Sequence, residues 1–149
     1  MPGTYLITPV VSGLSATNYT FTPANGMLTI NSWTTQGFFS PVDMGNVYNT
    51  VKSGQTVPLK FRVFAGAVER TDTGVLSAFT AAKVSCSNGL GEDAIEELVA
   101  STGGTVFRYD TTGGQFIYNW KTSGKAGDCY RVTAALQDGS KIQALFKLK

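Results

Sequence analysis

The sequence predicts an all-β protein, and three observations lead to this fold class. Only 15% of the 149 residues are charged, well below the quarter that is usual for soluble chains. β-Branched, aromatic and small polar residues are abundant, as are glycines (17), a composition suited to short strands joined by tight turns. Several stretches alternate apolar and polar residues with the period of a half-buried strand. At this length a single compact domain can bury a sizeable core.

The first thirty residues predict a β-meander. Residues 5–11 are rich in β-branched and aromatic side chains, a Ser-Gly pair interrupts them, and residues 18–22 resume the pattern. Asn25 and Gly26 form a dipeptide that favours a two-residue type I′ turn, so a hairpin is expected there. Because an isolated hairpin is marginal in water, this meander needs a partner.

A linker is expected at residues 34–37, and it places a domain boundary in the chain. Residues 1–33 then form a partial repeat or an N-terminal arm, and residues 34–149 form the second domain. Within that domain, residues 56–64 alternate and predict a half-buried strand. Pro58 cannot donate to a ladder, so it belongs at a sheet edge or among the first residues of that strand. The apolar face of the strand consists of Val57, Leu59, Phe61 and Val63.

The rest of the chain predicts a sandwich of short strands. Further strands are expected at residues 79–86, 105–109, 115–121, 130–136 and 141–148, and Gly- and Asp-rich turns separate them. The last two strands form a hairpin across Asp138 and Gly139. One short helix is expected at residues 92–100, where Ile95, Leu98 and Val99 share a face. The predicted fold is an immunoglobulin-like β-sandwich with one short helical insertion and an N-terminal β-meander or extended arm.

The composition excludes several functions. The net charge of +2 gives no reason to expect nucleic acid as a partner, and the absence of His excludes imidazole catalysis and His-ligated metals. No apolar run approaches the roughly 20 residues of a membrane helix, so no membrane insertion is expected. The N-terminus lacks the features of a signal peptide, so a secreted form is expected to be a mature or excised piece. We expect no enzyme activity, cofactor or metal.

The two cysteines, Cys86 and Cys129, are most simply interpreted as a disulfide, because one ends a predicted strand and the other begins one. A reactive thiol would need a His or a basic surrounding, and the chain has no His. The acidic residues near the expected helix are more simply a solvated helix face than a cation site or a catalytic carboxylate pair. These acids are Glu92, Asp93, Glu96 and Glu97.

Most of the chain resembles a known bacterial family. Pro58, Leu59, Lys60 and Phe61 match the motif that names the PxKF domain, which residues 37–149 resemble. The other blocks that carry the resemblance are residues 37–43, 49–54, 108–110, 118–122, 129–130 and 144–149. Residues 5–31 are similar to the C-terminal end of an MBG-type bacterial adhesin repeat, of which only the last strands are present.

The resemblance implies an extracellular or cell-surface bacterial protein without an established enzyme activity, and it names no ligand. We therefore expect a structural module that assembles into a fibre or surface layer by strand exchange through the arm, with itself or neighbouring repeats as partner. An adhesive module that binds a glycan or a protein is the alternative, as is a capsid decoration protein. Residues suggested for interaction are Tyr5, Ile7, Trp33, Phe38 and Phe39.

One covalent possibility concerns Lys60 and Asn119. A spontaneous Lys–Asn isopeptide bond would need both side chains buried beside a protonated carboxyl. The alternation of residues 56–64 instead places Lys60 on the polar face of its strand, and Asn119 is expected beside a turn. A cross-link is therefore the weaker interpretation of this pair.

Overall fold

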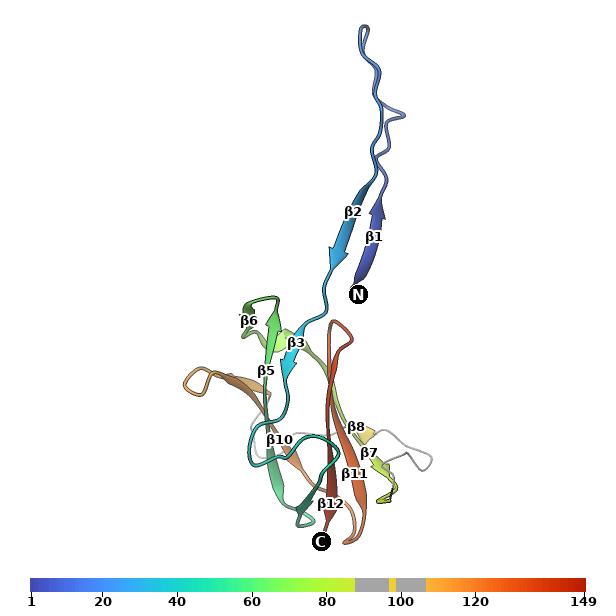
Figure 1. The fold of residues 1–149 in the computed structure, drawn as a ribbon. Helices are drawn as coiled ribbons and strands as arrows, with labels where there is room; N and C mark the ends of the chain where they lie inside the picture. The colour runs from blue at the N-terminus through green and yellow to red at the C-terminus, as the bar shows by residue number, and fades with distance from the viewer. Residues whose placement is uncertain (88–96, 99–106) are drawn as a thin grey trace.

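The computed structural model describes residues 1–87, 97–98 and 107–149, and these form an all-β chain. Figure 1 shows a sandwich of two sheets from which a thin two-stranded ribbon projects at one end. The all-β class predicted from composition and alternation is therefore confirmed. The ribbon is made of β1 (Gly3–Ile7) and β2 (Gly26–Ile30), which pair antiparallel.

The first sheet of the sandwich is built around β5 (Thr56–Ala65), its longest strand. All pairings in this sheet are antiparallel. The order is β3 (Thr34–Gln36), β5, β10 (Gln115–Lys121) and β9 (Arg108–Asp110), and β6 (Val68–Arg70) also pairs with β5.

The second sheet is built around the C-terminal hairpin of β11 (Cys129–Leu136) and β12 (Lys141–Leu148). One pairing in it is parallel, that between β4 and β12, and it joins residues distant in sequence. The order is β4 (Tyr48–Val51), β12, β11, β7 (Leu76–Val84) and β8 (Glu97–Leu98). A 3-10 turn, Thr73–Val75, leads into β7.

Aromatic rings from both sheets form the centre of the core. Phe61 of β5 lies 5.5 Å from Phe116 of the same sheet and 6.1 Å from Phe79 of the opposite sheet, between ring centroids. A second contact between the sheets is that of Trp120 of β10, which packs edge-on against Phe146 of β12 at 4.8 Å between ring centroids. Such ring pairs add roughly 0.5–1.5 kcal/mol each to the area that they bury. Burial of these rings is what holds the two sheets together.

Strands with clean alternation are found where the sequence predicts them. In β5 the four predicted apolar residues are all buried, and Pro58 lies third in the strand, as expected. β10 and β12 span the predicted residues, and the β11–β12 hairpin forms across Asp138 and Gly139, which has a φ of 91°. Tyr118 and Trp120 point into the core.

Three predictions for the N-terminal half are wrong. Asn25 and Gly26 do not form a hairpin turn, because Gly26 begins β2 and pairs with Ile7, which leaves residues 8–25 as one long connection. Residues 18–22 form no strand in this chain. The expected linker at residues 34–37 contains β3, which pairs with Arg62, Val63 and Phe64 of β5.

Two short strands, β4 and β6, were not predicted. Each has three or four residues, too few for alternation to be visible, and β4 is defined by its long-range pairing with β12. The helix expected at residues 92–100 lies largely outside the described residues. Its described part, Glu97–Leu98, is strand β8 paired with β7, so the helix prediction is wrong there.

The position of Phe61 leads to a stability prediction. Phe61→Ala should lower the free energy of unfolding by about 3–5 kcal/mol, because it removes a fully buried ring and leaves a cavity between the sheets. Urea unfolding followed by tryptophan fluorescence measures this change. Val68→Ala is the matched control, since Val68 is 68% exposed and should change stability by no more than about 0.5 kcal/mol. Equal effects of the two substitutions would contradict the described core.

Candidate functional site

The ribbon and the segment that joins its strands, residues 1–30, are referred to below as the arm. Figure 1 shows the arm extending away from the sandwich along most of its length. Its apolar side chains are exposed on both faces of the ribbon, for example Tyr5 at 43% and Leu6 at 62%, which are neighbours in β1 and point to opposite faces. The exposed large apolar residues of the arm are Met1, Tyr5, Leu6, Ile7, Val10, Leu14, Tyr19, Phe21, Met27, Leu28 and Ile30.

The arm contains no charged side chain. The first charged residue of the chain is Asp43, so all Lys, Arg, Asp and Glu residues follow the arm in the sequence. Exposed strand edges in monomeric proteins are normally protected by charges or by Pro within the strand, and an isolated two-stranded ribbon is marginal in water. An uncharged ribbon with apolar residues on both faces is therefore suited to bury itself against another surface.

The arm meets the sandwich at Trp33, which is held at two points. Its backbone N–H donates to Oδ2 of Asp138 over 2.6 Å, and its ring lies 5.3 Å from the guanidinium carbon of Arg70. Oδ1 of Asp138 accepts from both the N–H and the hydroxyl of Ser140. Partial burial by itself raises the pKa of Asp138, but these hydrogen bonds outweigh it and the pKa is lowered overall. The ionised carboxylate thus fastens the base of the arm to the β11–β12 turn.

The aromatic residues suggested for interaction do not form one exposed patch. Phe38 is only 3% exposed and packs edge-on against Phe61, so it is a core residue and its suggested interaction role is wrong. Trp33 and Phe39 are half-buried. Tyr5 and Ile7, the other two suggested residues, are exposed on the arm.

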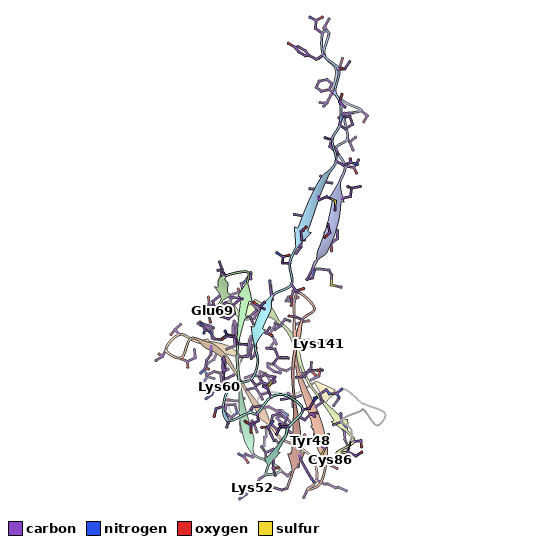
Figure 2. All side chains as sticks on the ribbon, in the orientation of Figure 1. Tyr48, Lys52, Lys60, Glu69, Cys86 and Lys141 are labelled. Atoms are coloured by element: carbon purple, nitrogen blue, oxygen red, sulfur yellow. A yellow bond between two sulfur atoms is a disulfide. The ribbon has the colours of Figure 1, made fainter. Side chains whose placement is uncertain are left out.

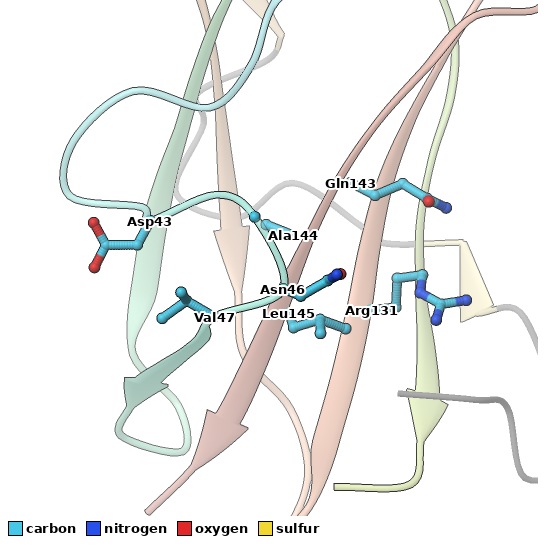
Figure 3. A pocket seen from close by; sticks show the side chains of 8 residues that line it. Asp43, Asn46, Val47, Arg131, Gln143, Ala144 and Leu145 are labelled. Carbon is cyan, nitrogen blue, oxygen red and sulfur yellow. The ribbon is translucent and has the colours of Figure 1, made fainter. Parts of the chain in front are cut away.

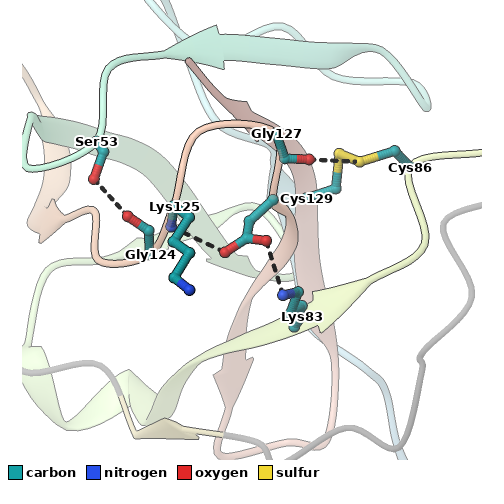
Figure 4. A network of polar contacts seen from close by, with 8 residues as sticks. Ser53, Lys83, Cys86, Gly124, Lys125, Gly127 and Cys129 are labelled. Carbon is teal, nitrogen blue, oxygen red and sulfur yellow. Dashed lines mark hydrogen bonds and ion pairs between the residues drawn. A yellow bond between two sulfur atoms is a disulfide. The ribbon is translucent and has the colours of Figure 1, made fainter.

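The predicted disulfide between Cys86 and Cys129 is confirmed, with the Cα atoms 5.3 Å apart. It joins the chain just beyond β7 to the start of β11. Figure 4 shows it near an ion pair that connects the same two regions. There Nζ of Lys83 lies 2.8 Å from Oδ1 of Asp128, and the N–H of Lys125 donates to Oδ2. The hydrogen bond with Lys83 is the largest cause of the lowered pKa of Asp128.

A polar cluster on the first sheet fixes β6 against β5. Arg62 makes a bidentate pair with Glu69, at 2.8 and 2.6 Å, and the hydroxyl of Tyr109 donates to the same carboxylate at 3.1 Å. The hydrogen bond from Arg62 lowers the pKa of Glu69, while burial and then Glu69 raise the pKa of Tyr109. Glu69 is thereby kept ionised as an acceptor, and Tyr109 is kept protonated as a donor.

Two of the four motif residues of the PxKF resemblance belong to the core of this structure. Leu59 and Phe61 are fully buried, while Pro58 and Lys60 lie on the other face of β5. Lys60 is opposite Ile117 in the register, and Asn119 is opposite Pro58, so Lys60 and Asn119 are diagonal neighbours on that outer face. Both are half-buried. The arrangement lacks the burial that isopeptide chemistry requires.

A hollow of about 220 Å³ lies where the loop before β4 crosses β12. Figure 3 shows the carboxylate of Asp43 and the guanidinium of Arg131 pointing to opposite sides of it. The remaining labelled side chains are amides and small apolar groups, so no charged groups converge on a ligand position. Pockets that bind small molecules usually combine an apolar lining with a few convergent polar groups.

The described residues contain no group of three Cys, Asp or Glu side chains placed to hold a metal ion. Within the same residues, no helix has the length and apolar character needed to cross a membrane. The acids Glu92, Asp93 and Glu96 lie outside the described part of the chain, as does the side chain of Glu97. No protein-family model, curated protein or solved structure matches this chain.

Sequence reasoning missed Asp138 and Arg70 as the residues that fix the arm. Asp138 was interpreted only as a turn residue, and its second role depends on the long-range approach of Trp33. The charge-free stretch that precedes Asp43 is visible in the sequence and would have indicated an unusual N-terminal segment. The arm, together with its anchored base, is the candidate functional site.

Replacing both cysteines should test the contribution of the disulfide. The double variant Cys86→Ala, Cys129→Ala should lose about 4 kcal/mol of unfolding free energy, because the bond closes a loop with a sequence separation of 43. Urea unfolding of the oxidised protein and the double variant measures the loss. The reduced natural protein is the matched control and should resemble the variant. Equal midpoints for all three would contradict this role.

Asp138→Asn tests the anchor of the arm through its pH dependence. Because the folded pKa of Asp138 is lowered, its carboxylate stabilises the fold above the ordinary Asp pKa of about 3.9, and this stabilisation is lost as the pH falls below that value through the folded pKa. The variant should be about 1 kcal/mol less stable at pH 7, and the difference should shrink towards pH 3. Urea unfolding at both pH values measures it.

The control for this comparison is Asp43→Asn, which removes an exposed carboxylate of the loop before β4. It should change stability by no more than about 0.5 kcal/mol. Backbone hydrogen exchange gives a local readout, because the Trp33 amide should exchange faster in Asp138→Asn only. A pH-independent difference between the natural protein and Asp138→Asn would exclude a charged anchor.

Proposed function

We propose that the protein is a non-enzymatic structural module of an extracellular bacterial surface protein, and that copies associate through the arm into a fibre or layer. The observation that supports this most directly is the arm itself, with apolar side chains exposed on both faces and no charge. Burying one such side chain contributes roughly 1.5–3 kcal/mol, so a few of them suffice for a stable contact.

The partner proposed for the arm is a second copy of the chain. The arm points away from its own sandwich, so its outer part cannot be covered by the fold from which it projects. A contact between the arm of one copy and the sandwich of the next uses two different surfaces. Because each copy then offers a free surface for a further copy, contacts of this kind produce filaments. The exception is a rotation between successive copies that closes the chain of copies into a ring.

An extracellular location fits two further properties. The disulfide is of the kind that persists in oxidising compartments and stabilises small secreted modules. The resemblance to PxKF and MBG-type sequences points to the same location. Enzyme activity has little support, because the polar clusters described above are satisfied pairs without a nucleophile beside a base.

Light scattering coupled to size-exclusion chromatography tests this proposal. The full chain should show an average mass several times 15.8 kDa that rises with concentration, and negative-stain microscopy should show elongated particles. A version that begins at residue 31 should be monomeric, because it retains the described core and the Trp33 anchor but lacks the arm.

The matched control is Val68→Lys, which replaces an exposed apolar residue of the sandwich and should leave the association unchanged. Circular dichroism must show that the shortened chain is folded. A full chain that remains monomeric at high concentration would contradict the proposed function. Assembly that persists in a folded chain without the arm would contradict it as well.

A further inference from the structure

We infer that residues 18–22 of one copy add a strand to the outer edge of β4 in the next copy, over the cleft between β4 and β5. This inference rests on the proposed function and identifies the surface that receives the arm. Strand addition of this kind takes its affinity from main-chain hydrogen bonds and its specificity from pockets for alternate side chains. Both the edge and the pocket are present here.

The cleft has a volume of about 310 Å³ and lies at the seam of the sandwich. Its walls come from both sheets, and its one charged lining residue in the described part of the chain is Asp43. The apolar and aromatic lining residues are Pro41, Tyr48, Val51, Val57, Pro58 and Phe146. A strand that carries no charge brings no ion of its own into such a cleft, so no charged side chain of the strand has to be desolvated.

The outer edge of β4 is open to a further strand. Within the described residues β4 pairs only with β12, which places it at the end of its sheet. The carbonyl of Val51 accepts from the N–H of Lys149 and therefore points towards β12. Since the polar groups of successive residues point to opposite sides of a strand, the N–H and C=O of Thr50 point towards the open edge.

The facing edge of β5 is a poorer acceptor. Pro58 of this strand, which pairs in register with Asn119 of β10, has no N–H to donate to an added strand. The carbonyl of Lys60 already accepts a hydrogen bond from the N–H of Phe39 at 2.8 Å. The short edge strands β6 and β9 both contain charged residues, a feature that discourages strand addition. β3 is uncharged as well, but it is shorter and lies at the base of the arm. β4 is uncharged and adjoins the cleft.

Residues 18–22 are the part of the arm that fits this edge. Their sequence, Asn-Tyr-Thr-Phe-Thr, alternates aromatic and polar residues and predicts a strand, yet the chain by itself forms none there. Tyr19 and Phe21 are 79% and 46% exposed. In a strand both would point to the same face, as the pockets of an acceptor require. The strand predicted by the sequence is thus explained as one that forms on association.

The positions of donor and acceptor exclude pairing within one chain. Residues 18–22 lie in the arm, which extends from the end of the sandwich that carries β3 and the β11–β12 turn. Figure 2 shows Tyr48, the first residue of β4, near the opposite end. The arm of one copy therefore reaches the cleft of another copy and not its own, which gives a head-to-tail chain.

The test uses full-length variants in pairs. Thr50→Pro removes the N–H at the open edge and should abolish assembly, whereas Thr50→Val keeps that N–H and should assemble like the natural protein. On the donor side, Phe21→Lys should abolish assembly, whereas Val68→Lys, at a sandwich residue that is 68% exposed, should not. Should circular dichroism show Thr50→Pro unfolded, Thr50→Lys replaces it, because Thr50 is exposed in the single chain and a Lys at an open edge discourages strand addition.

Mixing the two defective variants gives the sharpest result. Phe21→Lys keeps an intact edge and Thr50→Pro, or Thr50→Lys in its place, keeps an intact donor, so an equimolar mixture should form a 1:1 dimer of about twice 15.8 kDa and nothing larger. The inference would be overturned if folded Thr50→Pro or Thr50→Lys assembled like the natural protein, or if the mixture stayed monomeric. Either result would leave the proposed function unaffected. A natural protein that stays monomeric would overturn both.

Discussion

Phe61 brings aromatic rings of both sheets into one contact, and the rest of the sandwich is arranged around it. It meets Phe116 on its own sheet, Phe79 on the opposite sheet and Phe38 from the loop before β4. Through Phe38, the same contact holds the loop at residues 37–47 against the core. Pro41 and Asp43 of that loop line the cleft beside β4, together with residues of β4 and β5.

The sequence was most informative where a strand is half-buried within a sheet. Alternation in β5, β10, β11 and β12 identifies both the strands and their buried faces, because each apolar residue in them has a fixed side. It was uninformative for β4, whose position depends on a parallel pairing with residues nearly one hundred positions later. The Asn25-Gly26 signal failed for a related reason, since pairing of Ile7 with Gly26 overrode a local turn preference.

The candidate site was predicted only in part. Of the residues suggested for interaction, Tyr5 and Ile7 are exposed on the arm, whereas Phe38 is buried. Its burial was missed because aromatic residues in an irregular loop carry no periodicity that separates core from surface. The anchoring pair of Trp33 and Asp138 joins residues 105 positions apart. A contact between residues so far apart produces no pattern among neighbouring residues of the sequence. It can therefore be found only once the fold is known.

The position of the disulfide limits how far the molecule can be stretched. A pulling force between the arm and Lys149 passes through the bond between Cys86 and Cys129 and bypasses the chain between them. Even after complete unfolding, the segment of 43 positions between the two cysteines cannot be extended while the bond is intact. The maximal end-to-end length of the unfolded chain is therefore shorter by on the order of 140 Å. In a fibre of such modules, oxidation state would therefore set the maximal reach of each unit under tension.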